Sequence, residues 1–263
     1  MSDTVLVSAS EGVTTVTLNR PEALNSFTNE LKDTLLETLL QVAADPRARA
    51  VVITGAGRGF CAGQDLREHG DALAAGNEAA PLSTVERHYN PICLALATMP
   101  KPVIAAVNGM AAGAGASLSF ACDFRIAADN AKFLLAFANV GLALDTGASW
   151  TLPRLIGHAR ATALAILAEP VGASAALEMG LVNVVVPGGE LETTAFELAA
   201  RLAAGPTAAY AAIKEQLLYS AAHPLAAALE REGELQNALG SSRDHREATA
   251  SFLRKEKPIF HGR

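Results

Sequence analysis

The sequence has little of what marks several large classes of protein. Of its 263 residues only 5% are aromatic, 18% are charged and three are cysteines, Cys61, Cys93 and Cys122. An odd number of cysteines at irregular spacing argues against a disulfide framework and predicts reduced, structural thiols in a cytoplasmic protein. Half of the residues are hydrophobic, which predicts a well-packed globular chain rather than a disordered one.

Further absences narrow the possible functions. The formal net charge is −6, whereas general nucleic-acid binding needs a basic surface. Every apolar stretch is interrupted before about 18 residues, so we expect no membrane span. Residues 1–4 lack the positive region of a signal peptide. None of the six histidines is spaced as a metal ligand with another histidine, cysteine or carboxylate, so no metal site is expected.

Two glycine-rich stretches do not match nucleotide-binding motifs. Gly55-Ala56-Gly57 would need a further glycine at Phe60, and Gly113-Ala114-Gly115 would need one at Leu118. No Gly-Lys-Ser/Thr follows either stretch. The sequence therefore argues against nucleotide-phosphate binding of these kinds.

A serine-hydrolase motif is also incomplete. Gly115-Ala116-Ser117-Leu118-Ser119 has the first glycine and the serine of a nucleophile elbow, but Ser119 replaces the second glycine. We favour the interpretation that Ser117 is a small residue packed at the start of a helix.

The hydrophobic pattern predicts a mixed α/β core followed by helices. Strands are expected where apolar residues alternate or form short β-branched runs, and helices where they recur every three to four residues. The expected strands are 5–8, 13–18, 50–54, 103–107, 124–127, 132–135 and 182–186, and the expected helices are 28–43, 85–98 (disturbed at Pro91) and the segments beyond about 190, with breaks at 205–206, 224 and 240. Residues 67–82 are expected to be mobile. We assign residues 1–195 to the core and 196–263 to a helical region of the same functional unit.

The stretch Gly109–Ser117 is the centre of this arrangement. It follows a strand run at 103–107 and leads into the apolar segment 118–122, which reads as strand, small-residue turn and buried helix. The first amides of a helix have no partner within it, and the helix dipole favours negative charge there. Such a turn can hold an oxyanion.

Two aspartates allow two interpretations each. Asp145 lies among apolar residues, where a carboxylate would have a raised pKa and could move protons near neutral pH. It could instead cap the helix that carries Trp150, and the local sequence favours this cap. Asp65 offers the same choice, with the cap favoured more strongly. His88 is expected at a helix surface.

Taken together, the loops resemble those of a known family. Residues 60–66 (Phe-Cys-Ala-Gly-Gln-Asp-Leu) and 108–115 (Asn-Gly-Met-Ala-Ala-Gly-Ala-Gly) resemble the crotonase, or enoyl-CoA hydratase/isomerase, superfamily. The resemblance covers nearly the whole chain and includes 18–21, 101–105, 122–123 and 180–182. It implies an α/β spiral of β-β-α turns with a C-terminal helical region that packs in homotrimers, often paired into hexamers.

The resemblance also implies a site. Two backbone amides, matching Gln64 and Ala114, would grip the thioester oxygen of an acyl-CoA as it becomes an enolate. Preorganised amides of this kind contribute about 3 kcal/mol each. No separate cofactor is implied, because coenzyme A is part of the substrate. The matching CoA-binding positions are Arg20, Ala23, Leu24, Ala62, Gly63, Gln64, Asp65, Leu66, Arg67 and Gly113, with Phe252 and Lys255 from the tail.

The carboxylates decide which reaction the resemblance implies. Family hydratases use two glutamates, whose positions here hold Ser117 and Phe137. Family isomerases place a carboxylate later, at Asp145, which favours its catalytic interpretation. A dehalogenase branch adds a histidine at Asn90, absent here. We therefore expect an acyl-CoA isomerase that shifts a double bond or opens a ring epoxide. One alternative is an enoyl-CoA hydratase or another crotonase-type lyase or hydrolase. The other is a non-catalytic acyl-CoA-binding subunit.

Overall fold

In the part of the chain that the structure describes, ten strands form two β-sheets. The computed structural model describes residues 3–76 and 83–262. The first sheet has the order β1 (Val5–Ser10), β2 (Val13–Leu18), β3 (Ala50–Gly55), β5 (Val103–Val107), β7 (Phe124–Ala128) and β10 (Val184–Val186). The second has the order β4 (Gly59–Cys61), β6 (Met110–Ala112), β8 (Lys132–Leu134) and β9 (Val171–Gly172). β1 and β9 pair antiparallel with their neighbours, and the other ladders are parallel.

The chain passes from the first sheet to the second three times in the same way. Each of β3, β5 and β7 lies in the first sheet, and the strand that follows it, β4, β6 or β8, lies in the second. Helices α2 (Leu66–Ala74) and α5 (Ala114–Phe120) follow β4 and β6. This repetition forms the spiral of β-β-α turns. Because β4 and β6 pair in parallel, the loops that follow them leave the same edge of the second sheet.

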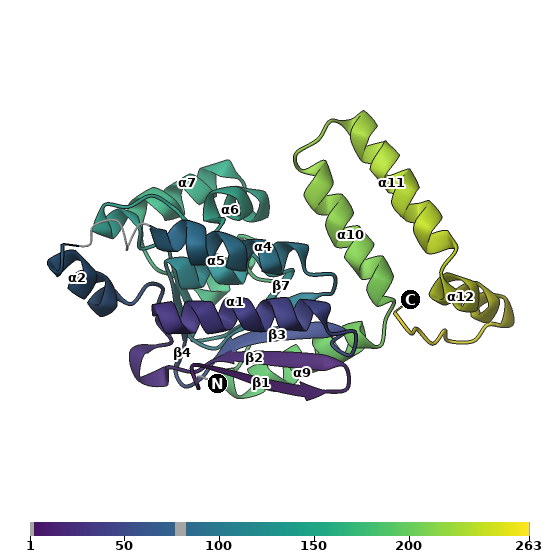
Figure 1. The fold of residues 1–263 in the computed structure, drawn as a ribbon, viewed down its shortest axis with the longest axis horizontal. Coiled ribbons are helices and arrows are strands. Elements are labelled where there is room, and N and C mark those ends of the chain that lie inside the picture. Colours follow the sequence, from purple (N-terminus) through teal and green to yellow (C-terminus); the bar gives the residue numbers. More distant parts are fainter. Residues whose placement is uncertain (1–2, 77–82, 263) are drawn as a thin grey trace.

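Helices cover both faces of the first sheet. Val51 of β3 belongs to the hydrophobic cluster that contains the buried face of α1 (Asn29–Ala44). Its neighbour Val52 belongs to a second cluster, which contains α9 (Leu191–Ala203). Because successive side chains of a strand point to opposite faces, α1 and α9 lie on opposite sides of the sheet (Figure 1).

Most elements expected from the pattern are confirmed. The N-terminal hairpin is β1 and β2, and Thr28 caps α1 by accepting a hydrogen bond from the Leu31 amide. The turn expected after β5 differs, because residues 110–112 form the short strand β6 before α5 begins. Of the segment expected to be mobile, residues up to 74 form α2, and residues 77–82 lie outside the described residues.

The helix expected over residues 85–98 is built in two parts. A π-helical turn, η2 (Val85–Tyr89), leads directly into α4 (Asn90–Thr98), whose first turn holds Pro91. Proline is tolerated there because it lies in the first turn of α4, at the junction with the wider π turn. The expectation that His88 lies at a helix surface was wrong. The wider π turn buries both His88 and Tyr89.

The remaining helices either complete the core or follow it toward the C-terminus. The core is completed by η1 (Pro21–Ala23), η3 (Ala138–Val140), α6 (Ala148–Ile156), α7 (His158–Leu167), α8 (Ala173–Glu178) and η4 (Gly188–Glu190). Beyond α9, the helices α10 (Thr207–Ser220), α11 (Leu225–Gly240) and α12 (Arg243–Arg254) stand away from the sheets (Figure 1). The boundary placed at residue 195 therefore lies inside α9, which packs on the sheet. Within the described ranges, no helix combines the length and apolar character needed to span a membrane.

Candidate active site

Two backbone amides, those of Gln64 and Ala114, project from neighbouring loops. Gln64 pairs with Phe27: the Phe27 amide donates to the Gly63 carbonyl at 2.7 Å, and the Asp65 amide donates to the Phe27 carbonyl at 3.0 Å. Because backbone direction alternates along an extended segment, the Gln64 amide points away from Phe27. Ala114 begins α5, where an amide has no partner within the helix. In the described turns, loops and caps neither amide donates a hydrogen bond, so both are available to an acceptor.

Glycines bring the two loops into contact. Gly63 has a φ of +85°, and a Cβ there would lie 3.5 Å from the Ala114 nitrogen and 2.7 Å from a backbone oxygen of β6. A Cβ on Gly115 would lie 2.2 Å from the carbonyl oxygen of Cys61. No larger residue fits at these positions without displacing the backbone. Gly113, the N-cap of α5, precedes Ala114. The two amides therefore lie in adjacent, closely packed loops.

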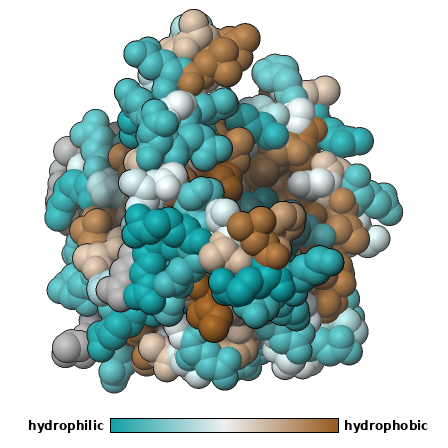
Figure 2. Space-filling model, turned by 90° about the vertical axis from the view of Figure 1, so that its right-hand side faces the viewer, coloured by the Kyte–Doolittle hydropathy of each residue, from teal (hydrophilic) through white to brown (hydrophobic). Residues whose placement is uncertain are grey.

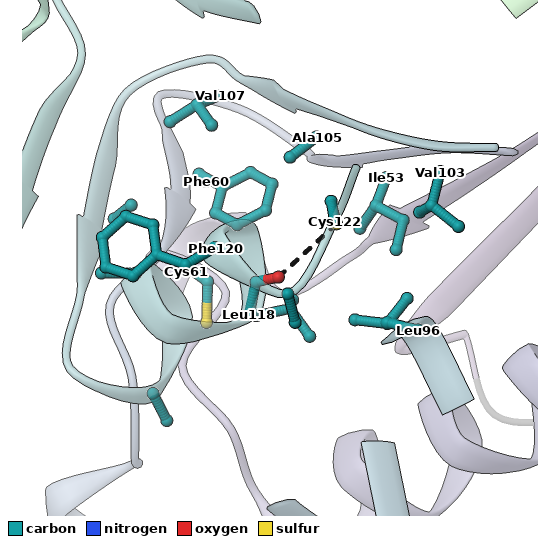
Figure 3. Close-up of a cluster of buried hydrophobic side chains, with 14 of the residues drawn as sticks. Ile53, Phe60, Cys61, Leu96, Val103, Ala105, Val107, Leu118, Phe120 and Cys122 are labelled. Carbon is teal, nitrogen blue, oxygen red and sulfur yellow. Dashed lines mark hydrogen bonds between the residues drawn. The ribbon is translucent and has the colours of Figure 1, made fainter. Parts of the chain in front are cut away.

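An apolar core supports these loops. Figure 3 shows Phe60 and Cys61 of β4 beside Leu118 and Phe120 of α5, and all four side chains are buried. Burial raises the pKa of the Cys61 thiol to about 12, so it stays neutral and unreactive. The three cysteines, all within the described residues, are free, as expected. Because interiors are close-packed, the loops cannot shift without disturbing this core.

Asp145 lies half-buried in the loop before α6. Burial raises the pKa of its carboxyl to about 6, against the opposing effects of a hydrogen bond from the Thr146 hydroxyl (2.8 Å) and the charge of Lys32. Burial and the charge of Asp145 also raise the pKa of Tyr89, whose hydroxyl donates to Gln64 Oε1. Asp145 is thus close enough to act electrostatically on the side chains that surround Gln64.

The alternative interpretation of Asp145 as a helix cap was wrong. The N-cap of α6 is Gly147, with no side-chain cap hydrogen bond. The Asp145 backbone carbonyl accepts from the Ala148 amide at 3.0 Å, while its carboxylate accepts from Thr146. The carboxylate is therefore not occupied by the amides of the helix, and a pKa near neutrality suits it to accept and return a proton.

The residues at the other positions that the resemblance implies, Ser117, Phe137 and Asn90, cannot accept and return a proton. Ser117 is fully buried, and its hydroxyl donates to the Gly113 carbonyl of its own helix at 3.1 Å, which also excludes an exposed nucleophile elbow. Phe137 is buried in the main hydrophobic core. Asn90 is exposed at the start of α4.

A cavity of about 740 Å³ lies beside the Gln64 loop. Six of the predicted CoA-binding residues line it: Arg20, Ala23, Leu24, Asp65, Leu66 and Arg67. Three acidic side chains, Glu22, Glu68 and Asp71, line it as well. Arg58, which the motif comparison missed, adds a second exposed guanidinium beside that of Arg67. Its position in the short loop that joins β3 of the first sheet to β4 of the second is the signal that could have identified it. Cations of this kind suit the phosphates of a polyanionic substrate.

Arg20 and Asp65 order the rim of this cavity. The Arg20 guanidinium donates to the Ser26 carbonyl at 2.6 Å and to Asp65 Oδ2 at 3.0 Å. Asp65 Oδ1 accepts from the Arg67 and Glu68 amides, which confirms the predicted N-cap. Burial alone would raise the pKa of Asp65, but these hydrogen bonds lower it, so the carboxylate stays charged.

The two candidates from the tail lie elsewhere. Phe252 on α12 and Lys255 just after it are exposed, and neither lines the cavity of this single chain. A role for them at the CoA site would require a second copy to bring its α12 to this cavity. In the part of the chain that the structure describes, no three His, Cys, Asp or Glu side chains are grouped so as to hold a metal ion.

Two residues at the site, Lys32 and Tyr89, were not predicted from the sequence. Lys32 and Tyr89 are buried, and both donate to Gln64 Oε1, Lys32 at 3.2 Å. A signal for Lys32 is present in the sequence: it stands at helical spacing from Leu35 and Leu39, on the apolar face of α1. A lysine on such a face needs buried polar partners.

Comparisons with known proteins agree with this geometry. The family model described as enoyl-CoA hydratase/isomerase matches residues 8–263. An Escherichia coli K12 protein named 1,2-epoxyphenylacetyl-CoA isomerase is 45% identical over 263 residues, 100% of both chains. A Rhodobacter capsulatus protein named as a probable enoyl-CoA hydratase is 44% identical over 99% of this chain and 98% of its own. The crystal structure of an enoyl-CoA hydratase/isomerase homologue from Mycobacterium abscessus has a TM-score of 0.94 and 46% identity, covering 98% of this chain and 100% of the other.

Proposed function

Because the chain belongs to the enoyl-CoA hydratase/isomerase family, we propose that it is an acyl-CoA isomerase with Asp145 as its acid/base residue. The observation that supports the proposal is which of the catalytic positions hold a carboxylate. Asp145 is half-buried with a pKa raised to about 6, while Ser117 and Phe137 stand where hydratases of the family have glutamates. One proton-transferring group and two free amides suit isomerisation, which returns the proton that it removes.

The proposed reaction proceeds through an enolate. With a 3-enoyl thioester, the Asp145 carboxylate takes a proton from C2, and the electron pair moves onto the thioester oxygen. The Gln64 and Ala114 amides donate to that oxygen, where preorganised donors stabilise developing charge by about 3 kcal/mol each. The Asp145 carboxylic acid then returns the proton at C4, and the double bond lies between C2 and C3. The atoms balance without addition of water.

We propose the ring epoxide of a phenylacetyl-CoA as the substrate to test alongside enoyl-CoAs. The proposal is supported by 45% identity over the whole chain to the Escherichia coli isomerase named for that substrate. Under this proposal the protein would act in the catabolism of phenylacetate, in the cytoplasm. The CoA part would lie in the cavity that Arg20, Leu24 and Arg67 line.

The decisive experiment follows a 3-enoyl-CoA by NMR in deuterated water. Wild type should move the double bond, and Asp145→Asn should lose about 10²–10⁴ in rate, the usual range for a general acid–base group. Binding of the CoA ester should persist in the variant. Asp129→Asn, a change at an exposed aspartate, serves as the matched control and should keep full activity.

Two other outcomes would replace the proposal. Crotonyl-CoA runs beside the 3-enoyl-CoA, and its hydration by wild type would identify a hydratase, the activity named for the Rhodobacter capsulatus relative. Tight binding of several thioesters without turnover, and without an effect of Asp145→Asn, would identify a binding subunit.

A further inference from the structure

The Gln64 side chain is held by two buried residues from two other elements. The Tyr89 hydroxyl and the Lys32 ammonium both donate to Gln64 Oε1, the latter at 3.2 Å. Tyr89 is 2% exposed and Lys32 is 0% exposed. We call these three side chains the Gln64 clamp. It joins α1, η2 and the loop after β4 at the residue whose backbone amide faces the site.

The clamp is fixed in turn by its own neighbours. Lys32 Nζ also donates to Thr84 Oγ1, and that hydroxyl shares a 2.9 Å hydrogen bond with His88 Nδ1. His88 Nε2 lies 3.0 Å from Asp33 Oδ1 on α1. The cluster is therefore closed on the side that faces away from Gln64. Its geometry leaves the donors little freedom to follow a displaced loop.

Tyr89 contacts the Gln64 loop at a second place. Its ring packs edge-on against Phe27, with the ring centroids 5.8 Å apart. The Phe27 backbone bonds to the residues on either side of Gln64. The hydroxyl thus holds the Gln64 side chain while the ring supports the strand segment that holds its backbone.

A second buried lysine shows what a purely structural arrangement looks like in this chain. Lys101 is also buried, and its ammonium donates to the backbone carbonyls of Val42 and Asp45. Lys32, in contrast, donates to two side chains, Thr84 and Gln64, the second of which lies in the site loop. Burying an ammonium group costs free energy unless the group is paired. The placement of the Lys32 ammonium against Gln64 therefore indicates a role in the site loop.

We propose that Lys32 and Tyr89 are positioning residues, which hold the Gln64 side chain so that its backbone amide stays aimed at the thioester oxygen. The inference rests on the proposed function, because it assumes that this amide serves as an oxyanion donor. Misplacement of a catalytic group by about 1 Å can cost on the order of 10² in rate, so a clamp on one side chain is sufficient to matter. The clamp acts on the amide through the Gln64 side chain.

The charge of Lys32 also affects Asp145, the proposed proton-transferring group. Its ammonium acts on Asp145, and it is itself surrounded by Glu68 of α2, Asp33 of α1 and the Arg87 and His88 side chains of η2. A nearby positive charge lowers the pKa of a carboxyl group. Removing the Lys32 charge should therefore raise the pKa of Asp145 and move the acid limb of the rate profile to higher pH.

The first test is a double-mutant cycle between Tyr89→Phe and Gln64→Met. Each single change should lower kcat about tenfold with KM within about twofold, since the amide grips the oxygen more strongly as charge develops. In the Gln64→Met background, Tyr89→Phe should add nothing. Tyr210→Phe on α10 is the matched control and should leave kcat unchanged. Additive losses, or full activity of Tyr89→Phe, would overturn the clamp.

The second test compares two buried lysines. Lys32→Met should move the acid limb of the kcat profile to higher pH, and Lys32→Arg should restore it in part. Lys101→Met should lower thermal stability and leave the limb in place. If the acid limb of Lys32→Met lay at the same pH as that of wild type, the Lys32 charge would have no effect on Asp145.

A third measurement separates this inference from the proposed function, because it needs no turnover. The infrared carbonyl stretch of bound [1-¹³C]crotonyl-CoA reports the hydrogen bonds to the thioester oxygen. Wild type should show a shift to lower frequency, and Tyr89→Phe should lose part of it while still binding the ligand. No shift in wild type would overturn both the oxyanion site and the clamp. The same shift in wild type and Tyr89→Phe would overturn the clamp alone.

Discussion

The position of Asp145 in the folded chain determines the pKa of its carboxyl group. In water its carboxyl would titrate near 3.8, and burial before α6 raises the pKa to about 6. A base of this strength is charged at neutral pH, yet its conjugate acid is strong enough to return the proton. Thr146 and Lys32 limit the shift, so the group stays usable instead of permanently neutral.

The pH dependence of isomerisation should follow this carboxyl group. Below about pH 6 Asp145 binds a proton and can no longer accept one, so kcat/KM should fall about tenfold per pH unit. A steady-state profile between about pH 4.5 and 8 measures the limb. A rate that is level down to the acid unfolding of the protein would contradict the assignment of Asp145 as the base.

The same shift predicts a cost in stability. Because the folded-state pKa of Asp145 is raised, its favourable contribution is complete below about 3.8 and is lost as the pH rises through about 6. Asp145→Asn should therefore gain free energy of unfolding relative to wild type as the pH rises across this window, by roughly 3 kcal/mol. Urea unfolding at both ends of the window measures the difference. A difference that stays constant with pH would show that the folded-state pKa is not raised.

At the scale of elements, β4 and α5 carry the site together. The two amides come from loops that follow adjacent parallel strands, and the strand β4 contacts α5 where Gly115 lies against the Cys61 carbonyl. The packing in Figure 3 continues this contact into the core. Activity and stability therefore depend on the same close approach.

Gly115→Ala should separate these elements. The added Cβ would lie 2.2 Å from the Cys61 carbonyl oxygen, so the variant should lose about 2–4 kcal/mol of stability, typical of overpacking against rigid backbone. Gly233→Ala, in the exposed interior of α11 with no atom near the new methyl group, should instead gain about 0.5–1 kcal/mol. Denaturant unfolding of both variants tests the pair. Equal stability of Gly115→Ala and wild type would mean that the two loops are not in contact.

The whole molecule exposes apolar side chains on the helices that stand away from its core. Large apolar residues exposed on or beside α10 to α12 are Ile213, Leu217, Leu225, Leu229, Phe252, Leu253 and Ile259. Figure 2, which views the molecule from this side, shows apolar patches among polar ones. Extended apolar surface of this kind marks interaction sites. We propose that these helices pack against other copies in a trimer or a pair of trimers.

Light scattering after size exclusion tests this assembly. Wild type should elute as three or six copies, and Leu217→Glu combined with Phe252→Glu should shift it toward the monomer, because buried charges oppose an apolar interface. Leu40→Glu, at an exposed apolar position of α1, is the control and should leave the assembly intact. A wild type that elutes as a monomer would contradict the proposal.

The local sequence pattern by itself determined most of the secondary structure of this protein. Hairpin, helix and strand positions follow from apolar periodicity, and the Asp65 cap follows from short-range chemistry, because each depends on neighbours a few residues away. The family resemblance that the paired glycine loops carry implied Gln64 and Ala114 as amide donors, and that role stays a prediction.

Tertiary structure decided what depends on residues far apart in the chain. Lys32, Gln64 and Tyr89 meet only because α1, the loop after β4 and η2 pack together. The π turn buried His88 against the local pattern, and Asp145 was freed from a capping role because Gly147 begins the helix. Burial and electrostatics depend on everything within several ångströms of a group, whichever part of the chain supplies it.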